Sequence, residues 1–131
     1  MALSRACLLA AGVLAATTGW AFADASGVWQ SEKKDGKYIH VEIALCDGSE
    51  SILCGTIVGA FGGASEANVG KPIIWDMEPD GENAWSGGRI WAPDEDETYR
   101  SEMELSGDIL TVSGCVLGGL ICRGQDWTRV R

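Results

Sequence analysis

The chain has 131 residues, with 19 acidic and 10 basic side chains and a formal net charge of −9. An acidic surface of this kind repels nucleic acid and anionic membranes, and the sequence holds no basic stripe, so the composition argues against a nucleic-acid-binding protein. The length fits one small domain.

The first 23 residues have the pattern of a secretory signal peptide. Arg5 gives a positive start, an apolar run follows over residues 6–16, and Ala21-Phe22-Ala23 is a small-x-small cleavage site. The run is too short to span a bilayer, and no later run reaches spanning length. We expect cleavage near Ala23 to leave residues 24–131 as one soluble domain, periplasmic or secreted, with a net charge of −10 because only Arg5 is lost.

Four strands are expected in the first half of this domain. Gly27-Val28-Trp29 opens it, and Tyr38 to Leu45 alternates clearly, with Ile39, Val41, Ile43 and Leu45 on one face. Residues 47–51 reverse the chain, residues 52–60 return, and residues 61–71 are rich in glycine, which predicts a mobile loop. A phosphate-binding loop is not expected, because Pro72 follows Lys71 where such a loop needs Ser or Thr. The fourth strand is expected over residues 72–78.

Four more strands are expected in the second half, over residues 84–91, 98–105, 109–117 and 120–130. Gly87-Gly88 within the first of these indicates a β-bulge or a close backbone approach. Gly118-Gly119 between the last two is a two-residue hairpin signal.

About eight short strands joined by short turns predict an all-β, antiparallel up-and-down barrel, closed or nearly closed. An open meander would leave two unpaired edge strands, which invite aggregation, and closure removes them. A two-sheet sandwich is the alternative.

The domain keeps four cysteines, Cys46, Cys54, Cys115 and Cys122, and an even number in a small exported chain favours disulfides. Their spacings do not fit the closely spaced ligand pairs of a zinc site, so no metal is expected. Counting outward from each hairpin places Cys46 opposite Cys54 and Cys115 opposite Cys122, within bonding reach. These two local pairs are therefore favoured among three connectivities.

Catalysis is not expected from these residues. His40 is the only histidine, so no serine or cysteine has an evident base, and no cofactor motif occurs. The acidic run from Asp94 to Glu97 reads as a solvated hairpin tip, because it lacks the glycine and the distant glutamate of a calcium loop. Whether it binds a cation stays open.

The domain is rich in tryptophan, with Trp29, Trp75, Trp85, Trp91 and Trp127. These rings either fill the core of a small domain or line a cavity for a small apolar or aromatic ligand. The candidate ligand-binding residues are Trp75, Trp85, Arg89, Trp91, Tyr99 and Met103, with Arg89 available to a ligand carboxylate if it points inward.

Several short segments together resemble a bacterial exported family named domain of unknown function 2147. The matching segments are Gly27-Val28-Trp29, Val41-Glu42-Ile43, residues 53–58, residues 85–90 with Pro93 and Tyr99, Gly114-Cys115-Val116 and residues 122–130. The chain departs from the family pattern at Asp96, where the family usually has glycine, and around residues 66–68.

The resemblance implies a small lipocalin-type barrel. Gly-x-Trp near the start is similar to the lipocalin opening strand, where a basic residue of the last strand packs over the tryptophan. Arg129 is the matching residue here, so Trp29, Trp127 and Arg129 are expected at the seam between the first and last strands. The resemblance implies no reaction.

Two functions remain open from the sequence. The domain is either a carrier of a small hydrophobic molecule inside the barrel, or a non-enzymatic envelope interaction protein whose barrel is filled. The sequence leaves the ligand and any protein partner unidentified.

Overall fold

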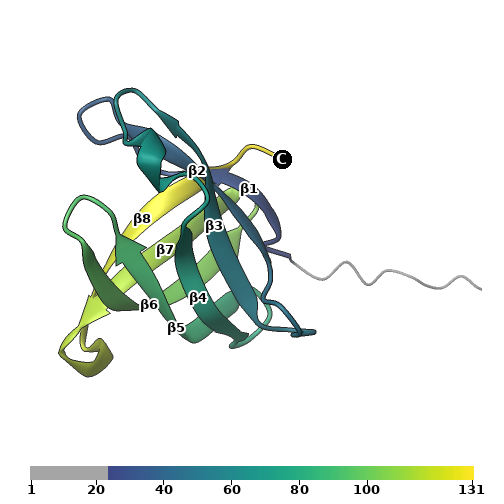
Figure 1. Ribbon diagram of the computed structural model, residues 1–131. Helices are drawn as coiled ribbons and strands as arrows, with labels where there is room; N and C mark the ends of the chain where they lie inside the picture. The colour runs from purple at the N-terminus through teal and green to yellow at the C-terminus, as the bar shows by residue number, and fades with distance from the viewer. Residues whose placement is uncertain (1–23) are drawn as a thin grey trace, which may run out of the picture.

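The computed structural model describes residues 24–131, and the predicted signal peptide lies outside the described residues. Eight antiparallel strands follow one another in chain order and close into a barrel (Figure 1). This confirms the predicted all-β up-and-down barrel and rejects the two-sheet sandwich. The strands are β1 (Gly27–Gln30), β2 (Tyr38–Leu45), β3 (Leu53–Phe61), β4 (Pro72–Pro79), β5 (Ala84–Ala92), β6 (Glu97–Ser106), β7 (Ile109–Val116) and β8 (Ile121–Arg129), with short 3-10 turns η2 (Glu66–Asn68) and η3 (Leu117–Gly119).

The barrel closes through a short seam between β1 and β8. Trp29 pairs with Arg129 and Gln30 with Thr128. Two further main-chain hydrogen bonds extend the seam, since the Val28 amide donates to the Arg131 carbonyl and the Val130 amide to the Val28 carbonyl, both at 2.7 Å. Closure gives partners to backbone groups that two edge strands would otherwise expose.

The two ends of the barrel differ in how well they are filled. The β2–β3, β4–β5 and β6–β7 turns surround what we call the closed end, where the buried side chains include Leu53, Met77, Trp85, Met103, Leu105 and Leu110. The β1–β2, β3–β4, β5–β6 and β7–β8 connections surround the open end. Strand alternation follows the prediction on β2, where Val41 and Ile43 are buried, but Leu45 at the strand end is 51% exposed.

The glycine pair in β5 is both a bulge and a close approach. The β5–β6 register shifts between Trp85 and Gly88, and Gly87 has φ +76°. A side chain at Gly88 would begin 2.3 Å from the Trp75 carbonyl oxygen of the neighbouring strand. The bulge lets β5 bend around the barrel while Trp85 still faces the core.

The β3–β4 loop, predicted as mobile, is a hydrogen-bonded structure. The Gly70 amide donates to the Ile57 carbonyl at 2.7 Å and the Ile57 amide to the Lys71 carbonyl at 3.0 Å, with η2 between them. The β1–β2 loop packs against it so closely that a methyl group at Gly62 would lie 1.9 Å from the Gly36 carbonyl oxygen. Figure 1 shows the two loops projecting side by side at the open end.

Both disulfides join the predicted local pairs, Cys46–Cys54 and Cys115–Cys122. Cys115 and Cys122 are direct cross-strand partners, as expected. In the first hairpin, however, Ala44 rather than Cys46 is the cross-strand partner of Cys54, so the predicted register there is wrong. That bridge is diagonal, across Cα atoms 4.9 Å apart.

Within the described chain, no helix has the length and apolar character needed to cross a membrane.

Candidate ligand-binding site at the open end of the barrel

A cavity of about 580 Å³ opens between the β5–β6 and β7–β8 hairpins. We call it the mouth. Its apolar lining includes Ile73, Ile90, Trp91, Tyr99, Val112 and Trp127. Polar side chains of the acidic turn and of β8 complete it. A volume of this size is in the range of small-molecule sites.

Two neighbouring strands build the polar wall of the mouth. On the β7–β8 ladder Leu110 pairs with Trp127, Val112 with Gln125 and Gly114 with Arg123. Because alternate residues of a strand share a face, these three pairs form one inward row. The first pair is buried in the core, whereas the last places Arg123 in the lining of the mouth.

Arg123 has no ion pair within the described residues, where the two salt bridges are Lys34–Asp94 and Arg129–Asp108. It lies in the same open cavity as the Gln125 amide. An unpaired guanidinium beside an amide can donate several hydrogen bonds to one anionic group.

Two aromatic rings form the rim, and the acidic turn fixes both. Trp91 Nε1 donates to Asp96 Oδ1 at 3.0 Å, and the Tyr99 hydroxyl donates to Glu95. The hydrogen bond to the Glu95 carboxylate raises the pKa of the Tyr99 hydroxyl above its usual value. Asp96 takes φ +52°, a left-handed conformation that explains why glycine suits this position. The acidic tip, expected to be merely solvated, therefore holds the rim rings in place.

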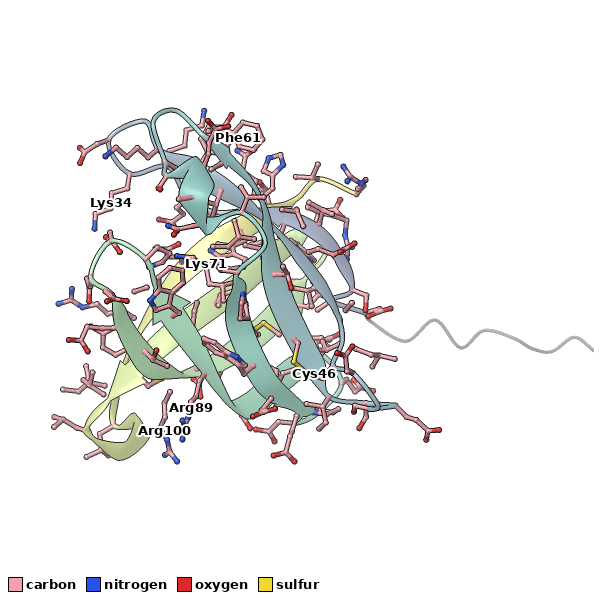
Figure 2. The ribbon with its side chains drawn as sticks, in the orientation of Figure 1. Lys34, Cys46, Phe61, Lys71, Arg89 and Arg100 are labelled. Atoms are coloured by element: carbon pink, nitrogen blue, oxygen red, sulfur yellow. A yellow bond between two sulfur atoms is a disulfide. The ribbon has the colours of Figure 1, made fainter. Side chains whose placement is uncertain are left out.

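An ion pair joins the acidic turn to the β1–β2 loop. Lys34 Nζ lies 2.7 Å from Asp94 Oδ2 across 60 residues of sequence. The hydrogen bond from Lys34 lowers the pKa of the Asp94 carboxyl, and the same bond raises the pKa of Lys34. Lys71 of the β3–β4 loop also reaches the rim, with Nζ 5.5 Å from the Trp91 ring centroid. Figure 2 shows Lys34 and Lys71 at this end of the barrel.

The structure divides the six sequence-predicted ligand residues into three groups. Trp91 and Tyr99 line the mouth. Trp85 and Met103 are cross-strand partners in the closed-end core, 7% and 2% exposed. Trp75 and Arg89 pair with each other on the outer face, where Trp75 is half-buried and Arg89 is exposed. Arg89 therefore does not point inward.

Of the three predicted seam residues, Trp29 and Arg129 contact each other, whereas Trp127 lies in the core and reaches the mouth. The Arg129 guanidinium lies 4.4 Å from the Trp29 ring centroid, and Trp29 Nε1 donates to the Ala25 carbonyl at 2.8 Å. Trp127 is 2% exposed and forms part of the cavity floor.

Arg123 and Gln125 were missed from the sequence. Alternation along the last strand from Trp127 would have placed both on the inner face. His40 hydrogen-bonds Gln30 at 3.1 Å and is not part of the lining, and burial lowers the pKa of its imidazole.

The comparisons with known proteins agree with this fold. One solved structure, described as "Protein HP1028 from the human pathogen Helicobacter pylori belongs to the lipocalin family", is similar with a TM-score of 0.67 and 13% sequence identity, over 83% of this chain and 84% of that one. At this identity the likeness shows the fold alone. No curated protein matches the sequence. A family model described as an uncharacterized protein conserved in bacteria (DUF2147) matches residues 27–129. The chain therefore belongs to the domain of unknown function 2147 family, with a lipocalin-like barrel.

Proposed function

We propose that the protein is an exported carrier that binds a small, mainly apolar molecule with an acidic group in the mouth. The observation that carries the proposal is the cavity of about 580 Å³, with aromatic and aliphatic walls and one unpaired guanidinium. The apolar body of the ligand would contact Trp91, Tyr99 and Ile90, and its acidic group would meet Arg123 and Gln125.

Two features support a binding role rather than catalysis. The side chains that meet at the mouth offer hydrogen bonds and apolar surface, and the single histidine of the chain is on the outer face beside Gln30. The rim rings are also held by carboxylates of the acidic turn, and a fixed rim lowers the entropy cost of binding.

The disulfides support an export compartment for this carrier. Two bridges indicate an oxidising environment outside the cytoplasm. With the predicted signal peptide at residues 1–23, this supports a periplasmic or secreted protein, matured by cleavage near Ala23.

The second candidate is a non-enzymatic envelope interaction protein. It is favoured by the closed end, where Trp85 and Met103 are buried in the core and do not line the mouth. A ligand test decides between the two candidates.

The test is a titration of decanoic acid and decanol against tryptophan emission, because Trp91 and Trp127 both line the mouth. We expect saturable binding of the acid, weaker binding of the alcohol, and about tenfold weaker acid binding in Arg123→Gln with the alcohol unaffected. Absence of any saturable change with aliphatic or aromatic acids would favour the interaction protein.

A cavity-filling variant gives an independent check. Gly114 faces the mouth, and its added Cβ would make only ordinary contacts, at 3.5 Å or more from the Tyr99 side chain. Gly114→Leu should therefore fold but block the ligand. Ser113→Leu places the same leucine side chain at the neighbouring outward position and should bind as the wild type does.

A further inference from the structure

The tip of the β7–β8 hairpin exposes aliphatic side chains that contribute nothing to the core. Val116, Leu117, Leu120 and Ile121 are 43%, 68%, 85% and 51% exposed. Single exposed apolar residues are ordinary, but four within residues 116–121 concentrate apolar surface on one hairpin tip.

The backbone at this tip is held in a demanding conformation. Leu117 has φ +54°, and Gly118 and Gly119 follow at +67° and +96°. A bulky residue in the left-handed region is an outlier that costs free energy, and Leu117 recovers little of that cost by burial because it is mostly exposed. The Cys115–Cys122 disulfide fixes the base of the tip. The protein thus maintains a strained and rigid turn that presents leucine to solvent.

Arginines lie beside this tip. Arg89 and Arg100 are direct cross-strand partners on the outer face, and Arg100 Nη1 donates to the Gly118 carbonyl of the tip at 3.2 Å. Figure 2 shows both side chains projecting from the same face of the sheet. Like charges placed directly opposite each other on a sheet are destabilising, and neither arginine has an ion pair within residues 24–131.

This unpaired cationic pair is unusual in a domain of net charge −10, which has carboxylates to spare. Residues 109–125 contain no acidic residue, and Glu102, whose carboxylate is near the disulfide sulfurs, is the acidic neighbour on β6. Trp75 continues the same outer row as the partner of Arg89. The docking surface consists of Trp75, Arg89, Arg100, Leu117 and Leu120.

We propose that the docking surface binds an anionic lipid bilayer, with Leu117 and Leu120 inserted among the acyl chains and Arg89 and Arg100 at the headgroup phosphates. Exposed aliphatic residues flanked by arginines and a half-buried tryptophan match the interfacial region of a membrane. The protruding tip is small for a stable protein interface, which needs about 1,000 Å² of good fit, whereas a bilayer adapts to its shape.

The negative net charge of the protein predicts repulsion from an anionic bilayer. We expect the docking surface to be an exception to this repulsion. Charges farther than about 8 Å are largely screened at physiological salt, so the distant carboxylates count less than the two local arginines, whose charge is offset in part by Glu102. Docking would also bring the mouth to the membrane, because Val116 and Ile121 belong both to the tip and to the cavity lining.

The test is flotation of the mature chain, disulfides intact, with vesicles of phosphatidylcholine alone or with about a quarter phosphatidylglycerol. The chain should float with the anionic vesicles. Arg89→Gln/Arg100→Gln should weaken this binding about 25-fold, from about fivefold per charge. Leu117→Ser/Leu120→Ser should weaken it at least about tenfold. Leu45→Ser, 51% exposed at the closed end, and Arg131→Gln serve as matched controls and should bind as the wild type does.

No flotation with anionic vesicles would overturn the proposal, as would equal losses in the control variants. Sedimentation of the same samples tests whether the docking surface instead binds a second molecule of this protein. If the wild type forms a dimer that Leu117→Ser/Leu120→Ser abolishes, and does not bind vesicles, the membrane proposal is also overturned. Leu117 and Leu120 are not among the lining residues, so decanoic acid binding by that variant shows whether a failure belongs to docking or to the mouth.

Discussion

At the scale of single residues, Arg129 joins three parts of the seam. Its guanidinium covers the Trp29 ring at 4.4 Å, donates to the Ser26 and Asp24 carbonyls at 3.1 and 3.0 Å, and has Nε 3.3 Å from Asp108 Oδ1. Arg129→Ala should lower the free energy of unfolding by about 2 kcal/mol in urea melts. The free energy of unfolding of Arg129→Lys should lie between those of the wild type and Arg129→Ala, because lysine keeps the charge but not the planar guanidinium.

The control for Arg129 is Arg89→Ala, since Arg89 is exposed and has no ion pair within the described chain. It should change the free energy of unfolding by less than about 0.5 kcal/mol. Equal losses in the two variants would show that the contacts around Trp29 do not strengthen the seam.

Single residues were predicted unevenly from the sequence, for a physical reason. Arg129 was expected from the resemblance to the lipocalin opening, which pairs a Gly-x-Trp start with a basic residue of the last strand. Trp75 was a candidate for the cavity because an aromatic residue on a strand carries no sign of which face it occupies, and Arg89 was a candidate only if it pointed inward. The bulge at Gly87 and the left-handed Asp76 each alter the local count, and only the folded register reveals them.

At the scale of elements, the Lys34–Asp94 ion pair links two loops of the open end and should give the mouth a pH dependence. Because the pKa of Asp94 is lower in the folded protein than its ordinary value of 3.8, the ionised carboxylate stabilises the fold above pH 3.8. That stabilisation is lost as the pH falls through the lowered pKa of the folded protein. The pKa of Lys34 is higher in the folded protein than its ordinary value of 10.5, so the protonated lysine stabilises the fold below pH 10.5. That stabilisation is lost as the pH rises through the raised pKa of the folded protein. The link should therefore hold from roughly pH 4 to pH 10.

A carboxyl-carbon NMR titration checks this link. Lys34→Met should return the pKa of Asp94 toward its ordinary value, while Lys33→Met, which removes the charge of the adjacent lysine, should leave it low. An unchanged Asp94 titration in Lys34→Met would mean that the two loops are not joined in solution.

The two disulfide hairpins offer a matched comparison of stability and docking. Each bridge closes a short loop, with sequence separations of 8 and 7, and should contribute about 2.5 kcal/mol by the chain-entropy model. Cys46→Ser/Cys54→Ser and Cys115→Ser/Cys122→Ser should therefore lower the free energy of unfolding similarly in denaturant melts. Only the Cys115–Cys122 bridge is at the base of the exposed tip, so only Cys115→Ser/Cys122→Ser should weaken vesicle binding. Equal vesicle binding by both variants would show that docking does not depend on the disulfide at the base of the tip.

The strands were predictable because period-two alternation is a local pattern, whereas the connections depended on tertiary contacts. The β3–β4 loop reads as flexible from its glycines, yet those glycines permit close packing against the β1–β2 loop at Gly36 and Gly62. The sequence of the acidic turn is typical of a solvated tip, yet Asp96 and Glu95 accept hydrogen bonds from Trp91 and Tyr99. These rings are close to the turn in sequence, but only the folded structure shows that their side chains reach it.

At the scale of the whole molecule, the barrel is filled at one end and hollow at the other. Counting strands predicts closure, because an even number of up-and-down strands brings the first and last together antiparallel. The count does not predict which end stays open. That depends on where large side chains fall along the inward rows, such as Leu110 and Trp127 below and Gly114 and Arg123 above. The hollow end and the docking surface thus share one side of the molecule.

The integrity of the whole barrel rests on the short β1–β8 seam, and Gly27 tests it. Gly27 has φ +137°, and a methyl group there would lie 2.5 Å from the Arg131 carbonyl oxygen and 2.9 Å from Arg129 Nη1. Gly27→Ala should therefore cost about 3 kcal/mol, by backbone strain plus separation of β1 from the chain end. Gly48→Ala is the matched control, because Gly48 also has a positive φ, +76°, but has nothing within 4 Å. It should cost only about 1 kcal/mol. Hydrogen exchange should accelerate at Val28 and Val130 in the first variant alone, and equal protection in both would show that the seam does not limit barrel stability.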